Sequence, residues 1–137
     1  MPIITWGKAL SVGYPAIDDD HQKLIALFNA AHGAVKQTSP RQAVETILTE
    51  LIDYTNWHFD HEEALMEEHG YDRIEAHKLE HQELAANARQ LYVQYLAGDD
   101  TVPEVLLPFL RNWLTDHILR SDKQLGDFLN GYQRQEL

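Results

Sequence analysis

The chain has 137 residues, a length that suits one domain with its own core, and we expect residues 1–137 to form that domain. It contains no cysteine, which excludes disulfides, thiolate zinc sites, iron–sulfur clusters and thiol catalysis, so any metal must be bound through nitrogen and oxygen. Eleven basic against 22 acidic residues give a net charge of −11, which argues against nucleic acid as a partner.

The first part of the chain reads as an irregular arm of residues 1–18. It lacks the basic flank and long apolar stretch of a signal peptide, and no run of about 18 apolar residues follows anywhere. We therefore expect a cytoplasmic protein without membrane insertion. Trp6 and Tyr14 are expected to pin the arm onto the domain.

A helix over 19–37 follows, with apolar residues at three- and four-residue spacing, and the acidic run 18–20 predicts its N-cap and first turn.

The second expected helix spans 41–69. Ser39 is a candidate N-cap, Pro40 suits a first helical position, and Gln42 lies three residues after the cap. Gly70 is expected to end this helix.

Two further helices are predicted over 73–97 and 102–130. Asp72 offers a cap for the third helix, and Gly98 offers its stop. Pro108 lies inside the fourth segment, where it removes a backbone hydrogen bond, so we expect a kink or a later helix start there. Short connections favour antiparallel neighbours, which predicts an all-α, up-down-up-down antiparallel four-helix bundle.

Several titratable residues lie on the apolar stripes of these helices, where unpartnered polar groups are rarely buried. In an antiparallel bundle the early parts of the first and third helices share a level with the late parts of the second and fourth. These residues all fall near that level: His21, His58, Glu62, His77, His81, His117 and Asp122.

Seven such groups are too many for one tetrahedral zinc ion, but they suit two metal ions that share bridging carboxylates. Imidazole and carboxylate together are appropriate for iron. Two ferrous ions against two carboxylates leave a charge of about +2, and a bridging hydroxide lowers it to about +1, which a dry core tolerates more readily.

Four motifs in this order resemble those of the hemerythrin family: IDDDH at 17–21, HFDHE at 58–62, HKLEH at 77–81 and HILRSD at 117–122. The resemblance spans nearly the whole chain. It departs at Asp20, where relatives often carry glutamine.

The resemblance implies two iron ions joined by an oxo or hydroxo group. It assigns His77, His81 and His117 to one iron, His21 and His58 to the other, and Glu62 and Asp122 to both. It also implies that dioxygen binds reversibly at an open position on one iron, for storage, for delivery to an oxygen-consuming enzyme, or for sensing.

An apolar pocket that excludes water should protect the bound oxygen from irreversible oxidation of the centre. We expect Leu114 to form its wall, with Trp113, Ile118, Leu24 and Phe59 as further candidates.

A binding protein is favoured over the alternative, a di-iron redox enzyme acting as an oxidase, a peroxidase or a nitric-oxide-handling protein. No histidine has glutamate three residues before it, as the ferritin-like di-iron enzymes require. Iron storage is a third possibility without specific support. Because the sequence ends soon after the fourth helix, we expect a stand-alone carrier rather than a sensor. We also expect a monomer.

Asp122 poses a geometric problem, because it lies five residues after His117 and therefore about 140° around a regular helix. A π-bulge between them would bring both side chains inward.

The remaining polar residues have ordinary interpretations. We expect His32 at the edge of the core and His69 at a helix end, where it complements the helix dipole. His61 is interpreted as solvated rather than as a support beside Glu62. Asp60 and Glu63 are interpreted as solvated helix charges.

Overall fold

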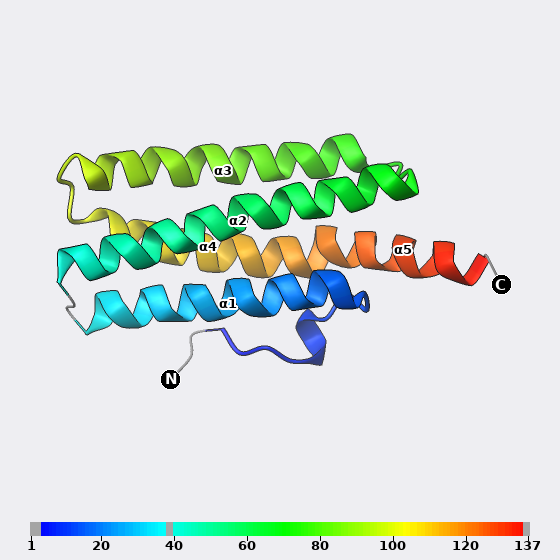
Figure 1. The fold of residues 1–137 in the computed structure, drawn as a ribbon, viewed down its shortest axis with the longest axis horizontal. Coiled ribbons are helices and arrows are strands. Elements are labelled where there is room, and N and C mark those ends of the chain that lie inside the picture. The colour runs from blue at the N-terminus through cyan, green and yellow to red at the C-terminus, as the bar shows by residue number, and fades with distance from the viewer. Residues whose placement is uncertain (1–3, 38–39, 136–137) are drawn as a thin grey trace.

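The computed structural model describes residues 4–37 and 40–135, and every regular element within these ranges is helical. Four rods run antiparallel along one axis (Figure 1). They are α1 (Pro15–Lys36), α2 (Arg41–His69), α3 (Ile74–Leu96) and a fourth rod built from α4 (Val102–His117), a π-helical segment η2 (Ile118–Asp122) and α5 (Lys123–Gln135).

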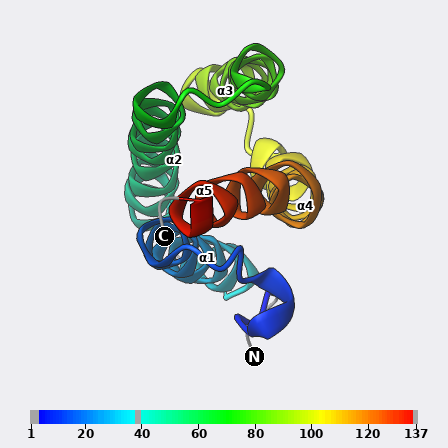
Figure 2. The same cartoon turned by 90° about the vertical axis from the view of Figure 1, so that its right-hand side faces the viewer.

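Neighbouring rods contact in a ring, since α1 meets α2, α2 meets α3, α3 meets α4, and α4 returns to α1, while α5 of the fourth rod also contacts α2. The end-on view shows this closed ring (Figure 2). The predicted all-α, up-down-up-down four-helix bundle is therefore confirmed. Across the described residues, no helix is long and apolar enough to cross a membrane.

The helix ends follow local chemistry, with some departures from expectation. Helix α2 covers the range that the sequence pattern predicts, and it ends at Gly70, whose φ of 66° lies in the left-handed region that glycine tolerates. The proposed cap Ser39 lies outside the described residues. The prediction of an Asp72 cap was wrong, because α3 begins after Arg73 without a side-chain cap.

The first helix starts earlier than expected. It begins at Pro15 rather than near residue 19, because Tyr14 is extended and proline suits the first helical position. The acidic run is therefore not an N-cap, although Asp18 lies in the first turn, as predicted. Asp18 instead accepts hydrogen bonds from the arm, at 2.6 Å from the Ser11 hydroxyl and at 2.8 Å from the backbone N–H of Val12.

Helix α4 runs through Pro108 from Val102, so the prediction of a later start was wrong. Proline removes the donor for the Glu104 carbonyl, but both residues are exposed, so water can hydrogen-bond that oxygen. The neighbouring Leu106, Leu107 and Leu110 are buried, and their packing holds the helix in place.

The core consists of two apolar clusters. One includes Leu24, Phe28, Phe59 and Leu114. The other contains Ile17, Met66, Ile118 and Leu125, and Trp6 and Tyr14 of the arm pack against it, as predicted. On every rod the polar residues singled out above lie where the chain passes from one cluster to the other.

We predict that Gly126→Ala destabilises the protein by about 1–3 kcal/mol, the usual cost of overpacking. Helix α5 approaches the arm closely at Gly126, where an added Cβ would collide with the backbone carbonyl of Val12. Urea unfolding measures the change. Gly131→Ala on the same helix is the control, since a Cβ there meets nothing within 4 Å and should stabilise by about 0.5–1 kcal/mol. Equal effects of the two substitutions would contradict this packing.

Candidate metal centre

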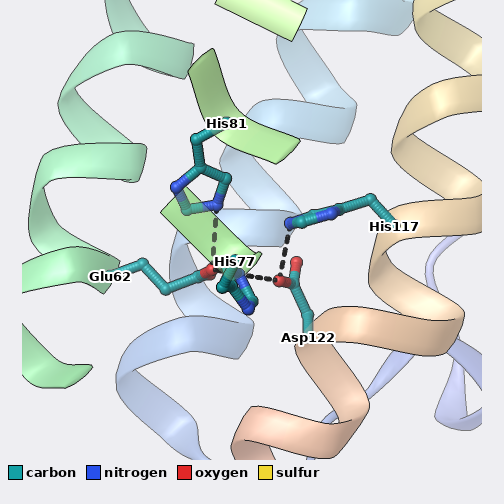
Figure 3. A group of neighbouring side chains, drawn as sticks. All are labelled: Glu62, His77, His81, His117 and Asp122. Atoms are coloured by element: carbon teal, nitrogen blue, oxygen red, sulfur yellow. Dashed lines mark hydrogen bonds and ion pairs between the residues drawn. The ribbon is translucent and has the colours of Figure 1, made fainter. Parts of the chain in front are cut away.

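Seven polar side chains from all four rods meet inside the bundle, and none is more than 4% exposed. Five of them are drawn in Figure 3, where they point toward one another. The structure thus brings together every residue that the sequence analysis proposed as a ligand: His21 from α1, His58 and Glu62 from α2, His77 and His81 from α3, His117 from α4 and Asp122 from η2.

The carboxylate of Glu62 lies at the middle of this group. Its Oε1 atom is 2.5 Å from Nε2 of His77 and 3.2 Å from Nε2 of His81. Its Oε2 atom is 3.1 Å from Nε2 of His58 and 3.9 Å from Nε2 of His21. The two oxygens therefore face different histidines.

Asp122 divides its oxygens in the same way. Its Oδ1 atom is 2.9 Å from Nε2 of His117 and 3.1 Å from Nε2 of His77. Its Oδ2 atom is 3.0 Å from Nε2 of His21. Both carboxylates thus present one oxygen to a three-histidine side and the other to a two-histidine side, which is the arrangement that bridging between two metal ions requires.

The side chains form two overlapping groups, and within each group one ligand atom per residue lies within 4.8 Å of all the others. We call them the three-histidine position, with His77, His81, His117, Glu62 and Asp122, and the two-histidine position, with His21, His58, Glu62 and Asp122.

The π-helical segment explains how Asp122 reaches the centre. It covers Ile118–Asp122, directly after His117, so the predicted π-bulge is confirmed. Hydrogen bonding to the fifth residue, rather than the fourth, widens the turn and places residues five apart on one face. Asp122 is consequently 1% exposed and faces the same interior as His117.

Buried atoms without partners test whether the residues fit metal ions. Among the described residues six buried nitrogen and oxygen atoms make no well-aligned hydrogen bond, although all but Nδ1 of His21 lie within ion-pair distance of another member of the group: Nδ1 and Nε2 of His21, Oε2 of Glu62, Nε2 of His81, Nε2 of His117 and Oδ1 of Asp122. Leaving such atoms unpaired in a core costs free energy, and a cation between them removes that cost. Five imidazoles and two carboxylates fit a pair of metal ions such as iron.

Three carboxylates outside the ligand set hold the outer nitrogens of the histidines. Nδ1 of His81 donates to Glu63 at 3.0 Å, and Nδ1 of His117 donates to Glu80 at 3.2 Å. Nδ1 of His58 donates to Asp20 at 2.9 Å. Such contacts fix the tautomer, so that Nε2 faces inward with its lone pair free for a metal.

These supports correct several sequence interpretations. Glu63 is not a solvated helix charge, and Asp20 is buried. His61 is only 32% exposed at its side chain and donates to Asp20 at 2.6 Å, so it is not simply solvated. Glu80 was not considered. The signal that could have found these carboxylates is their position, because Asp20, Glu63 and Glu80 each stand next to a proposed ligand.

The other histidines and Asp60 lie away from the centre. His32 is half-buried on α1, and Asp60 is exposed. His69 donates to the carbonyl of Leu65 within the last turn of α2.

The charged groups of the centre strongly shift one another's pKa values. Burial lowers the pKa of His58, but the hydrogen bond with Asp20 and the close contact with Glu62 outweigh it and raise the pKa to about 10. His77 is raised to a pKa of about 10 by Asp122 and Glu62 against the same effect of burial. Burial and the nearby Asp122 raise the pKa of Glu62, yet its histidine partners hold it well below its usual value. Without metal, protons on the histidines therefore balance the buried carboxylates.

Aromatic rings border the three-histidine position. Phe59 stacks on His81 with ring centroids 3.9 Å apart, and Trp113 stacks on His117 at 4.3 Å. Leu24 and Leu114 belong to the same apolar cluster as Phe59, whereas Ile118 belongs to the other cluster. The centre is thus enclosed by apolar groups at both ends.

Comparisons with known proteins agree on one family. The sequence profile of the hemerythrin HHE cation binding domain matches residues 12–129. A bacteriohemerythrin from Stenotrophomonas maltophilia is 35% identical over 98% of this chain and 87% of its own length, and one from Methylococcus capsulatus is 34% identical over 95% of this chain and 99% of its own length. A crystal structure of wild-type hemerythrin superposes with a TM-score of 0.87 at 33% identity, covering 93% of this chain and 98% of the other.

We predict that protein stripped of metal by a chelator is more stable at about pH 6 than at about pH 9. His58 and His77 hold their protons up to a pKa of about 10 when folded, but titrate near 6.5 when unfolded. Their stabilisation is complete below about pH 6.5 and is lost as the pH rises toward 10. The lowered carboxylate pKa values affect stability only at lower pH. Urea unfolding across this range measures the trend, and a rise in stability from pH 6 to pH 9 would contradict it.

Proposed function

The chain belongs to the hemerythrin family, and from that premise we propose that it binds dioxygen reversibly at a centre of two iron ions, for oxygen storage or for delivery to an oxygen-consuming enzyme. We assign His77, His81 and His117 to one iron, His21 and His58 to the other, and Glu62 and Asp122 to both. The observation that carries this proposal is the division of each carboxylate between the two histidine groups.

When bound, the iron pair with its bridging oxo or hydroxo group supplies an open coordination position and reversible electron exchange with dioxygen. The protein has three tasks around it. It must present lone pairs at fixed positions, keep the charge of the site low, and exclude water.

The outer carboxylates perform the first task. Because Glu63 and Glu80 accept the Nδ1 protons of His81 and His117, the inward nitrogens of these rings are the free ones. The imidazole rings of His81 and His117 cannot flip without breaking these hydrogen bonds.

The ligand set performs the second task. Five neutral imidazoles add no charge, so Glu62 and Asp122 are the only charged members of the ligand set, and they offset part of the charge of the cations. A donor set dominated by imidazole resembles a carrier site more than a carboxylate-rich site that activates oxygen.

Burial performs the third task. The seven side chains are at most 4% exposed, and the rings of Phe59 and Trp113 cover two of the histidines. Leu114 is 3% exposed and lies three residues before His117, so the two share a helix face. We propose that these apolar groups limit the supply of protons and water to the bound oxygen.

The central experiment is an oxygen cycle on iron-loaded protein. We expect two irons per chain and, after anaerobic reduction, a visible charge-transfer band that appears with oxygen and disappears when the gas is removed, over several cycles. Irreversible oxidation in the first cycle would overturn the carrier proposal and favour a redox enzyme with the same centre. Glu62→Ala is the control variant, since it removes one shared carboxylate and should abolish the two-iron stoichiometry.

We predict that Leu114→Ala shortens the lifetime of the oxygen-bound form severalfold. Truncation opens a cavity beside the centre, which gives water and protons access, and costs about 2–5 kcal/mol of stability. The decay of the visible band in air measures the lifetime. Leu114→Met keeps the volume and should decay much more like the wild type. Equal decay in all three proteins would show that Leu114 does not protect the site.

A further inference from the structure

We propose that Asp20 is the positioning residue for the two-histidine position alone, with His61 as its outer support. This inference rests on the two-metal centre of the proposed function. It adds that the histidines of the two metal positions are oriented by separate sets of outer carboxylates, so that each position can be weakened by itself.

Asp20 binds two imidazoles through a single oxygen. Its Oδ2 atom accepts from Nδ1 of His58 at 2.9 Å and from Nδ1 of His61 at 2.6 Å. Both histidines lie on α2 three residues apart, so they share one helix face toward α1. Asp20 is 6% exposed, which makes these contacts strong and leaves water little chance to replace them.

The outer end of this network is anchored by contacts between tilted aromatic rings. The ring of His61 lies 5.1 Å from the ring of Trp57, which lies 5.4 Å from Tyr54. Trp57 is 53% exposed, so the contacts lead from the surface through His61 and Asp20 to His58. His61 thereby holds the carboxylate of Asp20 in place, and Asp20 in turn orients the proposed ligand His58.

The two metal positions differ in how well they are supported. Glu63 and Glu80 hold two members of the three-histidine position, His81 and His117. At the two-histidine position Asp20 holds His58, whereas Nδ1 of His21 has no hydrogen-bond partner within the described ranges. Removing Asp20 therefore leaves neither histidine of that position oriented through its outer nitrogen, and leaves the other position intact.

Asp20→Asn removes the negative charge, and its amide can offer only one neutral oxygen to two donors. Loss of such an outer carboxylate typically lowers metal affinity about 10–100-fold. The loss should fall on one metal equivalent, because only His58 among the proposed ligands contacts Asp20 through its outer nitrogen.

The test is a calorimetric titration of metal-free protein with Co²⁺ alone. We expect two tight equivalents for the wild type, and for Asp20→Asn one equivalent weakened about 10–100-fold with the other unchanged. Asp19→Asn is the matched control, because it removes the same charge from the neighbouring residue and should keep both equivalents. Circular dichroism confirms that each variant remains helical.

Glu80→Gln completes the design, since it should weaken the other equivalent, and the Asp20→Asn, Glu80→Gln double variant should weaken both. If the double variant keeps one tight equivalent, the two supports act on the same position and the inference fails. It also fails if Asp20→Asn changes neither equivalent, or changes both alike.

His61→Leu provides a second route if Asp20→Asn does not fold. It removes the outer support at a part-exposed position, so a smaller loss at the same single equivalent is expected, and no loss overturns the role of His61. A wild type that takes up fewer than two Co²⁺ ions would overturn the two-metal centre itself. A wild type with two equivalents and indifferent variants would overturn only the positioning role.

Discussion

The structure depends on two carboxylates buried at the middle of a helical bundle. Glu62 and Asp122 are at most 1% exposed, and a buried negative charge is tolerable only when cations or hydrogen-bond donors surround it. Five imidazoles from the four rods surround these carboxylates, and an imidazole can compensate their charge in two ways. Protonated, it balances the carboxylates directly; neutral, it joins them in holding a metal. The same geometry therefore suits the bundle with and without metal, and metal uptake must release protons.

The supports of the histidines follow a simple rule of helix geometry. A residue next to an inward-facing ligand lies about 100° around the helix and thus faces the neighbouring helix. Asp20 beside His21 on α1 reaches α2, Glu63 on α2 reaches α3, and Glu80 on α3 reaches α4. All four rods supply ligands to the centre, and each of the first three also orients a ligand of the next rod along the chain. The order of the helices around the bundle therefore determines which histidine each outer carboxylate contacts.

Sequence periodicity predicts the fold and the meeting of the seven groups, because both depend on spacing within helices and on antiparallel order. The π-bulge was predictable for the same reason, since His117 and Asp122 cannot both face inward on a regular helix. The supporting carboxylates were missed, because periodicity alone does not mark them. Glu63 and Glu80 lie off the apolar stripe, where periodicity indicates solvent, and only the packing of two helices brings them to an imidazole. Pro108 shows the converse, because its local signal for a later helix start did not decide where α4 begins.

The two apolar clusters determine how the centre relates to folding. They flank it along the bundle axis, with Leu24 and Phe28 on one side and Ile17 and Leu125 on the other. Apolar burial at both ends holds the rods together without a contribution from metal, in contrast to small domains that fold only around an ion. The ligands are consequently preorganised, and binding need not order the backbone. Selectivity between the two metal positions must then arise from local differences around each histidine, which is where the outer carboxylates differ.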